Sequence, residues 1–366
     1  MSHPSFLLVD VDQNIFTESQ SLELESFRID WFPFKGGVSD GVWALQIRNQ
    51  IGSATWLATR GMSLYDVHVG DTRFGWRSPV RGPVHPQWVN LGEPSGLGWL
   101  DGFDELLVRC GLDSNGAPQF AENGNLEFGL HGRIGNLPVR SLSIERSGNN
   151  QLLIHSVVEE TRFHFSKWRL ETTTMISDDS MRIETTDRVT NLAGTTRDCQ
   201  LLYHFNLGQP LLNGSGSVHV PLRDLEPRDE VAQTALGDWQ TMTPPEPNYA
   251  EQVFFGRTIG DDDGRSLAVA TDGERNKAGM IEFAVDTLPC FSVWKNCVAF
   301  EDGYVVGLEP ATNFPNSKRV ERAAGRTVSL EPGASESFEI AMDFSCDSMT
   351  TRNWLERVER LSKTIA

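Results

Sequence analysis

Three segments of the chain each place an ionisable side chain between an apolar run and a break rich in glycine, proline or asparagine. They are Gly129–Pro138 with His131, Leu201–Pro210 with His204, and Gly307–Asn316 with Glu309. Such a pattern is typical of strands that end at the rim of a binding site. Histidine and glutamate are common general acids and bases, because their surroundings can bring their pKa values close to the working pH. The three residues therefore form a candidate acid–base site.

Each of these residues also has an ordinary structural interpretation. His131 could belong to a turn, His204 could lie at the edge of the core, and Glu309 could pair with a base at a strand end. Taken alone, none of the three segments identifies a function. Their order along the chain carries more information than any one of them.

Other residues near these segments could bind a substrate. Four of them lie close to His131 in the sequence or on the strand expected before that of Glu309: Arg133, Asn136, Trp294 and Lys295. Arg60 and Arg109 could reach the same site. A tryptophan offers a flat face to a sugar ring, and lysine and arginine donate hydrogen bonds to hydroxyl or anionic groups. All six could equally be core residues or members of ion pairs.

Strands are the elements expected to position these residues. Trp168–Ile176 and Met181–Val189 alternate in polarity, are rich in threonine, and flank the polar turn Ser177–Ser180, which predicts a hairpin. Thr161–Ser166 is expected to be a further strand. Similar runs recur to about residue 341, separated by turn signals. The pattern predicts an all-β fold of the sandwich type.

Two stretches depart from the strand pattern. Thr351–Thr364 carries an apolar stripe and predicts a helix on the exterior of a sheet, capped by Ser348 or Thr350. Gly70–Gly102 is rich in glycine, proline and tryptophan and lacks alternation. Long irregular segments within a compact β fold are often functional rims, so we expect this one to border a site.

Composition excludes several classes of function. The chain has 366 residues with 50 acidic and 32 basic side chains, a net charge of −18. Such a protein would repel a phosphate backbone and an anionic membrane surface, so nucleic acid and membrane partners are not expected. The apolar share of 39% is sufficient to bury a core.

The cysteines and histidines give no sign of a disulfide framework or a metal site. The five cysteines are odd in number and form no C-x-x-C pair, which favours reduced thiols and a cytoplasmic location. The histidines lack the spacing of metal ligands, so no metal is expected. No signal peptide and no transmembrane run is predicted.

The ordered segments resemble the aldose 1-epimerase (galactose mutarotase-like) superfamily. The motifs that carry the resemblance are Leu130-His131-Gly132, His204-Phe205-Asn206-Leu207 and Leu308-Glu309-Pro310. The likeness is greatest to an uncharacterised branch that carries Arg60-Gly61-Met62, Cys110-Gly111-Leu112 and Gly129–Arg133. The resemblance covers about residues 30–345. His204 and Asn206 are closer together than in the best-known mutarotases, which leaves the identity of the sugar open.

This resemblance implies a β-supersandwich of mainly antiparallel sheets with an open cleft. It implies one domain over residues 1–366, with a core at about 30–345 and a C-terminal helix at about 350–364. It also implies a cofactor-independent isomerase that interconverts sugar anomers, with Glu309 as the base and His204 as the acid at the ring oxygen. His131 would help to hold charge there, and Arg109 resembles a substrate-binding arginine of the family.

Two alternatives stay open at this stage. A protein with the same cleft could bind carbohydrate without catalysis, although such a protein has no need of an acid–base pair. A lyase or hydrolase on a related scaffold has less support, because no paired catalytic carboxylates or tyrosine–histidine constellation is evident. The partner is expected to be a small sugar or sugar derivative, and the oligomeric state is open.

Overall fold

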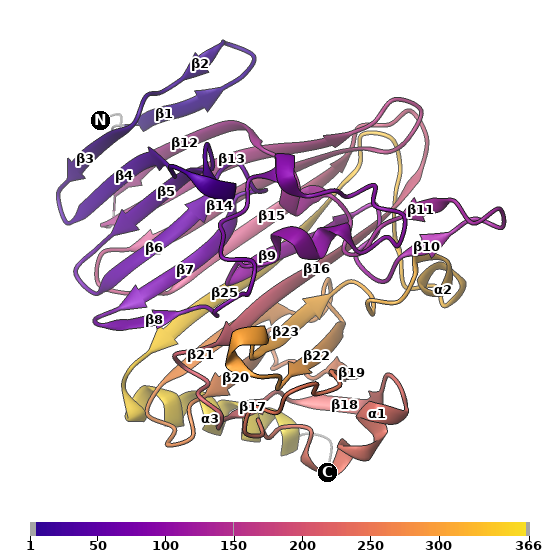
Figure 1. Cartoon of the computed structure of the whole chain (residues 1–366). Coiled ribbons are helices and arrows are strands. Elements are labelled where there is room, and N and C mark those ends of the chain that lie inside the picture. The colour runs from indigo at the N-terminus through magenta and orange to yellow at the C-terminus, as the bar shows by residue number, and fades with distance from the viewer. Residues whose placement is uncertain (1–4, 149, 364–366) are drawn as a thin grey trace.

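The computed structural model describes residues 5–148 and 150–363 and consists mainly of antiparallel strands in two large sheets (Figure 1). The predicted all-β supersandwich is confirmed. Figure 1 shows the long strands of both sheets running diagonally across the molecule, with α3 at one end. Within the described residues, three α-helices lie outside the sheets: α1 (Glu230–Thr234), α2 (Lys318–Ala323) and α3 (Ser348–Ser362).

The first sheet has ten strands. In spatial order they are β17 (Ser217–His219), β20 (Arg265–Thr271), β21 (Ala278–Ala284), β25 (Ser335–Ser345), β15 (Ile183–Asn191), β14 (Lys167–Ser177), β13 (Gln151–Thr161), β12 (Val139–Ser147), β1 (Ser5–Asp10) and β2 (Ile15–Phe16). The predicted threonine-rich hairpin is confirmed as β14 and β15, which pair along most of their length.

The second sheet has thirteen strands. Eleven follow one path: β18 (Leu222–Pro227), β19 (Gln252–Thr258), β22 (Cys290–Asn296), β23 (Val305–Ala311), β16 (Arg197–Gly208), β9 (Leu107–Leu112), β7 (Ser63–Val69), β6 (Gly52–Leu57), β5 (Trp43–Arg48), β4 (Phe27–Pro33) and β3 (Gln20–Leu24). The other two, β24 (Val328–Leu330) and β8 (Thr72–Phe74), pair with β16 and β7. A separate hairpin joins β10 (Gln119–Phe120) and β11 (Leu126–Phe128).

The strand β16 is buried on both of its faces. Tyr203, Phe205 and Leu207 belong to the main core between the sheets, whereas Leu202 belongs to a smaller apolar cluster on the other face. That cluster includes Trp99, which comes from the irregular segment between β8 and β9. Because successive residues of a strand point to opposite faces, His204 shares the face of Leu202. The candidate site thus lies outside the main core, under the irregular segment.

The predicted C-terminal helix is confirmed, with a different cap. Asp347, not Ser348 or Thr350, caps α3, and its Oδ2 accepts a hydrogen bond from the Thr350 N–H at 2.7 Å. An aspartate immediately before the first turn also suits the positive end of the helix dipole. The apolar stripe of α3 packs on β20 and β21, as expected for the exterior of a sheet. The predicted end of the helix at Thr364 lies outside the described residues.

The predicted strand at Thr161–Ser166 is wrong. β13 and β14 pair in an unbroken register from Gln151 opposite Ser177 to Thr161 opposite Lys167. Residues 162–166 therefore close this hairpin as a turn, and the side chain of Phe163 is 80% exposed. The alternating phenylalanines imitate a strand because the turn itself is apolar.

Two observations bear on the cellular setting. No helix within residues 5–148 and 150–363 is long and apolar enough to cross a membrane. All five cysteines are free thiols, and only Cys346 is exposed.

Candidate active site

His204 and Glu309 meet across the neighbouring strands β16 and β23. Phe205 lies opposite Leu308 and Asn206 lies opposite Gly307, and this register places His204 directly beside Glu309. His204 Nε2 is 3.2 Å from Glu309 Oε1, and the two side chains are only 4% and 3% exposed. The two residues proposed as acid and base therefore share one site, although it is more enclosed than the expected open cleft.

The register extends this site across the sheet. Glu309 on β23 lies opposite Ser292 on β22, which in turn lies opposite Phe255 on β19. Trp294 lies opposite Gly307, one alternation further along the same face. These residues share the face of Glu309 because side chains two apart on a strand point the same way.

Gly307 provides the space in which the pair meets. A Cβ atom at this position would lie 2.8 Å from Glu309 Oε1 and 3.0 Å from His204 Cε1. Any side chain there would push the carboxylate or the imidazole out of place. The glycine is therefore required by close approach.

A hydrogen-bond chain fixes the orientation of the His204 ring. Nδ1 lies 2.6 Å from Asn206 Oδ1, and Asn206 Nδ2 donates to the carbonyl oxygens of Glu105 and His204, each at 3.0 Å. Because the amide nitrogen is engaged as a donor, Oδ1 is the acceptor and Nδ1 carries the proton. The nitrogen with a changeable proton is thus Nε2, which faces Glu309.

Burial shifts both members of the pair toward their uncharged forms. It raises the pKa of Glu309 to about 8, helped by the nearby Glu251 and opposed by Arg228. It lowers the pKa of His204 to about 3, helped by His131 and opposed by the hydrogen bond to Asn206. Near neutral pH the pair therefore holds one proton, which resides on Glu309 and is donated to Nε2.

His131 is the third predicted residue at this site. It occupies a turn with φ 57° and its Nδ1 lies 2.8 Å from the carbonyl oxygen of Asn115. Its ring centroid is 5.3 Å from that of His204. Burial lowers the pKa of His131 to about 4, so the ring is neutral. With Nδ1 donating to the carbonyl, Nε2 is left as an acceptor.

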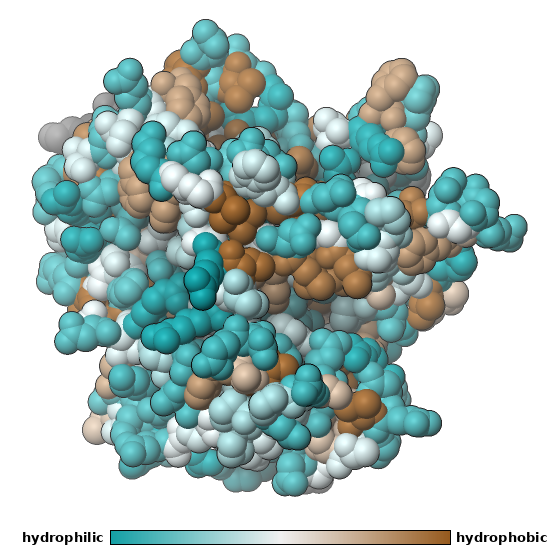
Figure 2. All heavy atoms as spheres, viewed as in Figure 1, coloured by the Kyte–Doolittle hydropathy of each residue, from teal (hydrophilic) through white to brown (hydrophobic). Residues whose placement is uncertain are grey.

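Aromatic rings cover the pair. Trp99, in a short 3-10 helix at Gly98–Gly102, has its ring centroid 4.6 Å from His131 and 6.2 Å from His204. Phe103 and Trp294 lie 5.0 Å and 5.5 Å from His204. Figure 2 shows apolar surface across the middle of this face, where the irregular segment crosses β9 and β16. The segment expected as a functional rim thus borders the pair.

Several residues of the site were not singled out from the sequence. Trp99 belongs to the irregular segment Gly70–Gly102, which was expected to border a site without any residue being named, and Phe103 directly follows that segment. No feature of the sequence pointed to Ser292, because a single serine in an apolar strand is normally a buried packing residue. Its Oγ is buried and has no hydrogen-bond partner among the residues that the structure describes. Glu251 accepts a hydrogen bond from Trp294 Nε1 at 2.7 Å at the outer edge of the site.

The expected convergence of basic residues is not found. Arg109 lies opposite Tyr203, on the other face of the sheet, with its Nε 2.5 Å from Asp187 Oδ2. Arg60 is also fully buried, with its Nε 2.8 Å from Glu105 Oε1 and its other nitrogens donating to backbone carbonyls. Their donors are already occupied, so we correct the expectation that Arg60 and Arg109 bind the sugar.

Lys295 requires the same correction. It follows Trp294 on β22 and therefore points to the opposite face, where it is 1% exposed with its Nζ 3.5 Å from the carbonyl oxygen of Asp238. The alternation that brings Trp294 to the site turns the lysine away from it.

Arg133 and Asn136 lie beside the site rather than in it. Arg133 lines a neighbouring cavity of about 420 Å³ that also includes Trp99 and Glu160. Asn136 is 5% exposed, and both polar atoms of its amide lack a partner within the described part of the chain. It stays a candidate for a ligand contact. The described residues include no group of histidine, cysteine and acidic side chains arranged to hold a metal ion.

Comparison with known proteins agrees with this architecture. A family model described as "Domain of unknown function (DUF4432)" matches residues 39–344. The chain belongs to this family. A crystal structure described as "a putative aldose 1-epimerase" from Klebsiella pneumoniae is similar to this DUF4432 protein with a TM-score of 0.93 and 29% identity, over 98% of this chain and 96% of that chain.

More distant structures share the fold. A galactose mutarotase-like protein from Clostridium acetobutylicum has a TM-score of 0.59 at 14% identity, over 88% of this chain and 99% of that chain. An Escherichia coli protein, also described as "a putative aldose 1-epimerase", has a TM-score of 0.54 at 13% identity, over 82% and 98%. A search of curated proteins finds no match. The fold of this DUF4432 member is that of the aldose 1-epimerase and galactose mutarotase-like proteins.

Proposed function

We propose that this protein is an isomerase that interconverts the anomers of a sugar by acid–base ring opening, with Glu309 as base and His204 as acid. The observation that carries the proposal is the buried contact of 3.2 Å between His204 Nε2 and Glu309 Oε1. A buried acid and histidine whose pKa values are displaced in opposite directions are typical of catalytic sites.

The reaction uses the single proton of the pair. Transfer of that proton from Glu309 to His204 Nε2 yields a carboxylate and an imidazolium without exchange with solvent. Glu309 then takes the proton of the C1 hydroxyl while His204 gives its proton to the ring oxygen. The bond between C1 and the ring oxygen breaks, and C1 becomes an aldehyde.

Ring opening returns the pair to its resting form, with the proton on Glu309 and Nε2 of His204 free. Rotation about the C1–C2 bond exposes the other face of the aldehyde. The former ring oxygen attacks C1 and gives its proton to His204, while Glu309 returns a proton to the C1 oxygen. Return of the proton from His204 Nε2 to Glu309 then restores the resting pair. Protons and electrons balance over this cycle, so the sequence of steps requires no cofactor.

The surrounding residues supply binding contacts for a sugar or sugar derivative. Trp294 offers a ring face, His131 offers Nε2 as an acceptor, and Ser292 offers an unpaired hydroxyl group. Because His204 and Glu309 are almost fully buried, the rings of Trp99 and Phe103 must move before a sugar can reach them. Those rings would then shield the reaction from bulk water.

The test is the rate of anomer exchange, measured by NMR or polarimetry on a panel of neutral, phosphorylated, uronic and sulfonated sugars. The unmodified protein should accelerate exchange of at least one sugar over buffer. Glu309→Gln and His204→Ala should each lose about 10²–10⁴-fold of the rate. An unchanged rate in both variants would contradict the mechanism. Binding of a sugar without exchange would support a non-catalytic carbohydrate-binding protein instead.

We also propose a cytoplasmic location, consistent with five unbridged thiols.

A further inference from the structure

A cavity of about 500 Å³ lies beside the catalytic site and is lined by different residues. Its wall is formed largely by the segment that follows β8. Its charged lining consists of three arginines, Arg73, Arg77 and Arg81, and three acidic residues, Asp66, Asp104 and Glu301. We propose that this cavity binds a small organic anion that also carries hydroxyl groups, such as the phosphate ester of a polyol.

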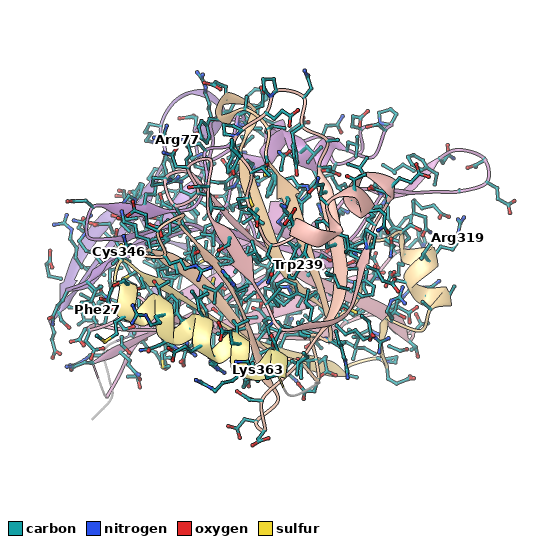
Figure 3. All side chains as sticks on the ribbon, turned by 90° about the horizontal axis from the view of Figure 1, so that it is seen from below. Phe27, Arg77, Trp239, Arg319, Cys346 and Lys363 are labelled. Atoms are coloured by element: carbon teal, nitrogen blue, oxygen red, sulfur yellow. The ribbon has the colours of Figure 1, made fainter. Side chains whose placement is uncertain are left out.

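Two arginines at this cavity have no partner in the described part of the chain. Arg77 and Arg81 are exposed, and neither side chain forms an ion pair or hydrogen bond with any residue that the structure describes. Figure 3 shows Arg77 at the outer edge of the molecule, beyond the sheets. In a protein of net charge −18, most arginines are engaged by nearby carboxylates, as Arg60 and Arg109 are. Two free guanidinium groups at one cavity form a local site of attraction for an anion.

A third arginine is fixed in the wall, where the carboxylate of Asp66 balances its charge. Arg73 Nε is 3.0 Å from Asp66 Oδ2, and Arg73 Nη1 donates to the carbonyl oxygen of Trp76 at 3.0 Å. Because these contacts hold the Arg73 side chain in the wall, it cannot swing away to solvent. The anion-binding end of the cavity is therefore partly preorganised.

Asp104 is the residue that we expect to bind the hydroxyl groups of the ligand. It is 3% exposed and lines the cavity, and neither carboxyl oxygen has a hydrogen-bond partner among the described residues. Burial raises its pKa well above the usual range, with a further contribution from Glu105. A carboxyl group in its neutral form can donate one hydrogen bond and accept others, so a ligand hydroxyl group pairs with Asp104 once the wall opens to its two buried oxygens. Leaving it unpaired costs stability, which a bound polyol would restore.

Size and composition of the remaining wall fit such a ligand. A volume of about 500 Å³ lies within the usual range for small-molecule sites, about 300–1,000 Å³. Trp76, Pro79 and Phe300 provide apolar surface for a carbon skeleton. The cavity thus combines charge for an anion, a buried acid for hydroxyl groups and a ring for carbon atoms.

This site shares a wall with the catalytic pair but does not depend on it. The ring centroid of Trp76 is 4.8 Å from that of Phe103, and the ring centroid of Phe103 is 5.0 Å from that of His204. Neither His204 nor Glu309 lines the cavity. The proposal therefore stands apart from the proposed isomerase activity, and it can fail while that activity holds.

The experiment is isothermal titration of the full chain with D-glucitol 6-phosphate, which has no anomeric carbon and so cannot be a substrate of a mutarotase. D-glucitol and inorganic phosphate are the matched probes for its two parts. We expect the ester to bind at least tenfold more tightly than either part. The double variant Arg77→Gln/Arg81→Gln should lose at least tenfold in affinity. Arg352→Gln, an exposed arginine on α3, is the control and should bind normally.

A second variant tests the role of Asp104. Asp104→Leu should bring the affinity for the ester down to that for phosphate alone, while phosphate binding is unchanged. Glu309→Gln should bind the ester normally, because the catalytic pair lies outside the cavity. Undiminished binding in the double arginine variant, loss of binding in Glu309→Gln, or equal affinity for the ester and phosphate would each overturn the proposal. Thermal unfolding of each variant shows that a change in affinity is not a loss of folding.

Discussion

Tyr203 and His204 are neighbours on β16 that lie in contrasting polar environments on opposite faces of one sheet. On the inner face, the Tyr203 hydroxyl donates to Asp187 Oδ2 at 2.7 Å, and Arg109 and Thr172 donate to the same carboxylate. On the outer face, the only polar contact of the Glu309 carboxyl group within residues 5–148 and 150–363 is with Nε2 of His204. The first carboxylate is saturated with donors, whereas the second shares one proton with its partner.

This difference in hydrogen bonding distinguishes a buried carboxyl group that stabilises the fold from one that can take part in a reaction. A carboxylate surrounded by donors links the two sheets through charge-assisted hydrogen bonds. A carboxylic acid with a raised pKa beside a histidine with a lowered pKa holds one transferable proton, and the two pKa values keep that proton on the acid until a substrate stabilises the charged pair. Both sites are fully buried, so burial alone does not identify a catalytic group. The two sites differ instead in the number of hydrogen bonds that each carboxyl group accepts.

Removing the outer carboxylate should have the largest effect on activity. Glu309→Gln keeps the shape of the side chain but cannot carry the shared proton, so we expect the rate of anomer exchange to fall by about 10²–10⁴-fold. NMR exchange measurements on a sugar that the unmodified protein turns over provide the test. Glu356→Gln, on the exposed face of α3, is the control and should be fully active. A loss of less than threefold in Glu309→Gln would remove Glu309 from the reaction.

Removing the inner carboxylate should instead have the largest effect on folding. Asp187→Asn leaves the buried Arg109 guanidinium without its counter-charge, so the free energy of unfolding should fall by about 3–5 kcal/mol. Urea unfolding followed by tryptophan fluorescence measures this change. The exchange rate per folded molecule should be close to normal, because the carboxylate lies on the far face. If activity vanished while stability held, the separation of the two faces would be wrong.

The pH dependence of the anomer exchange rate should reveal the proton that Glu309 and His204 share. The pair must hold one proton in total to act, and it loses that proton as the pH rises through about 8. The enzymatic rate should therefore be level through neutral pH and fall about tenfold per pH unit well above 8. The measurement is the exchange rate from pH 5 to 10 after subtraction of the buffer rate. A rate that rises through pH 8 would show that Glu309 acts as an independent base.

The pH dependence of stability gives a separate measure of the same group. The pKa of Glu309 is raised from 4.5 to about 8, so between these values the folded state holds a proton that the unfolded state has released. The contribution of Glu309 to stability is therefore present in acid and is lost as the pH rises through about 8. Glu309→Gln should show a less negative slope of unfolding free energy from pH 5 to 8. Parallel slopes in the two proteins would rule out the raised pKa.

The smallest effect is expected at the unpaired hydroxyl of the outer site. Ser292→Ala removes a buried Oγ that has no partner in the described structure, so the unfolding temperature should not fall. If Ser292 binds a sugar hydroxyl, KM should rise by roughly 3–10-fold, the worth of one hydrogen bond. The steady-state exchange kinetics of the variant measure this rise. An unchanged KM would leave the serine as a packing residue.

Much of the secondary structure could be predicted from the sequence, because alternation of polarity and apolar stripes are local patterns. Alternation identified the hairpin of β14 and β15, and the apolar stripe identified α3. The residues 162–166 were misassigned because two exposed phenylalanines imitate a strand that the pairing of β13 with β14 excludes. The cap of α3 was predicted at Ser348 or Thr350 instead of Asp347, because all three side chains are of types that cap helices.

The residue types and their order in the chain determined the candidate chemistry. His131, His204 and Glu309 were selected from the sequence, and the structure brings all three together. Which basic residues lie near them was decided only by tertiary structure. Arg109 and Lys295 each stand on a strand of the site, yet strand register turns both of them to the far face. Pairing between strands that are distant in the sequence determines which side chains face the candidate site and which face the core between the sheets. A strand that is buried on both faces has apolar residues on both, so its local sequence pattern does not distinguish the two.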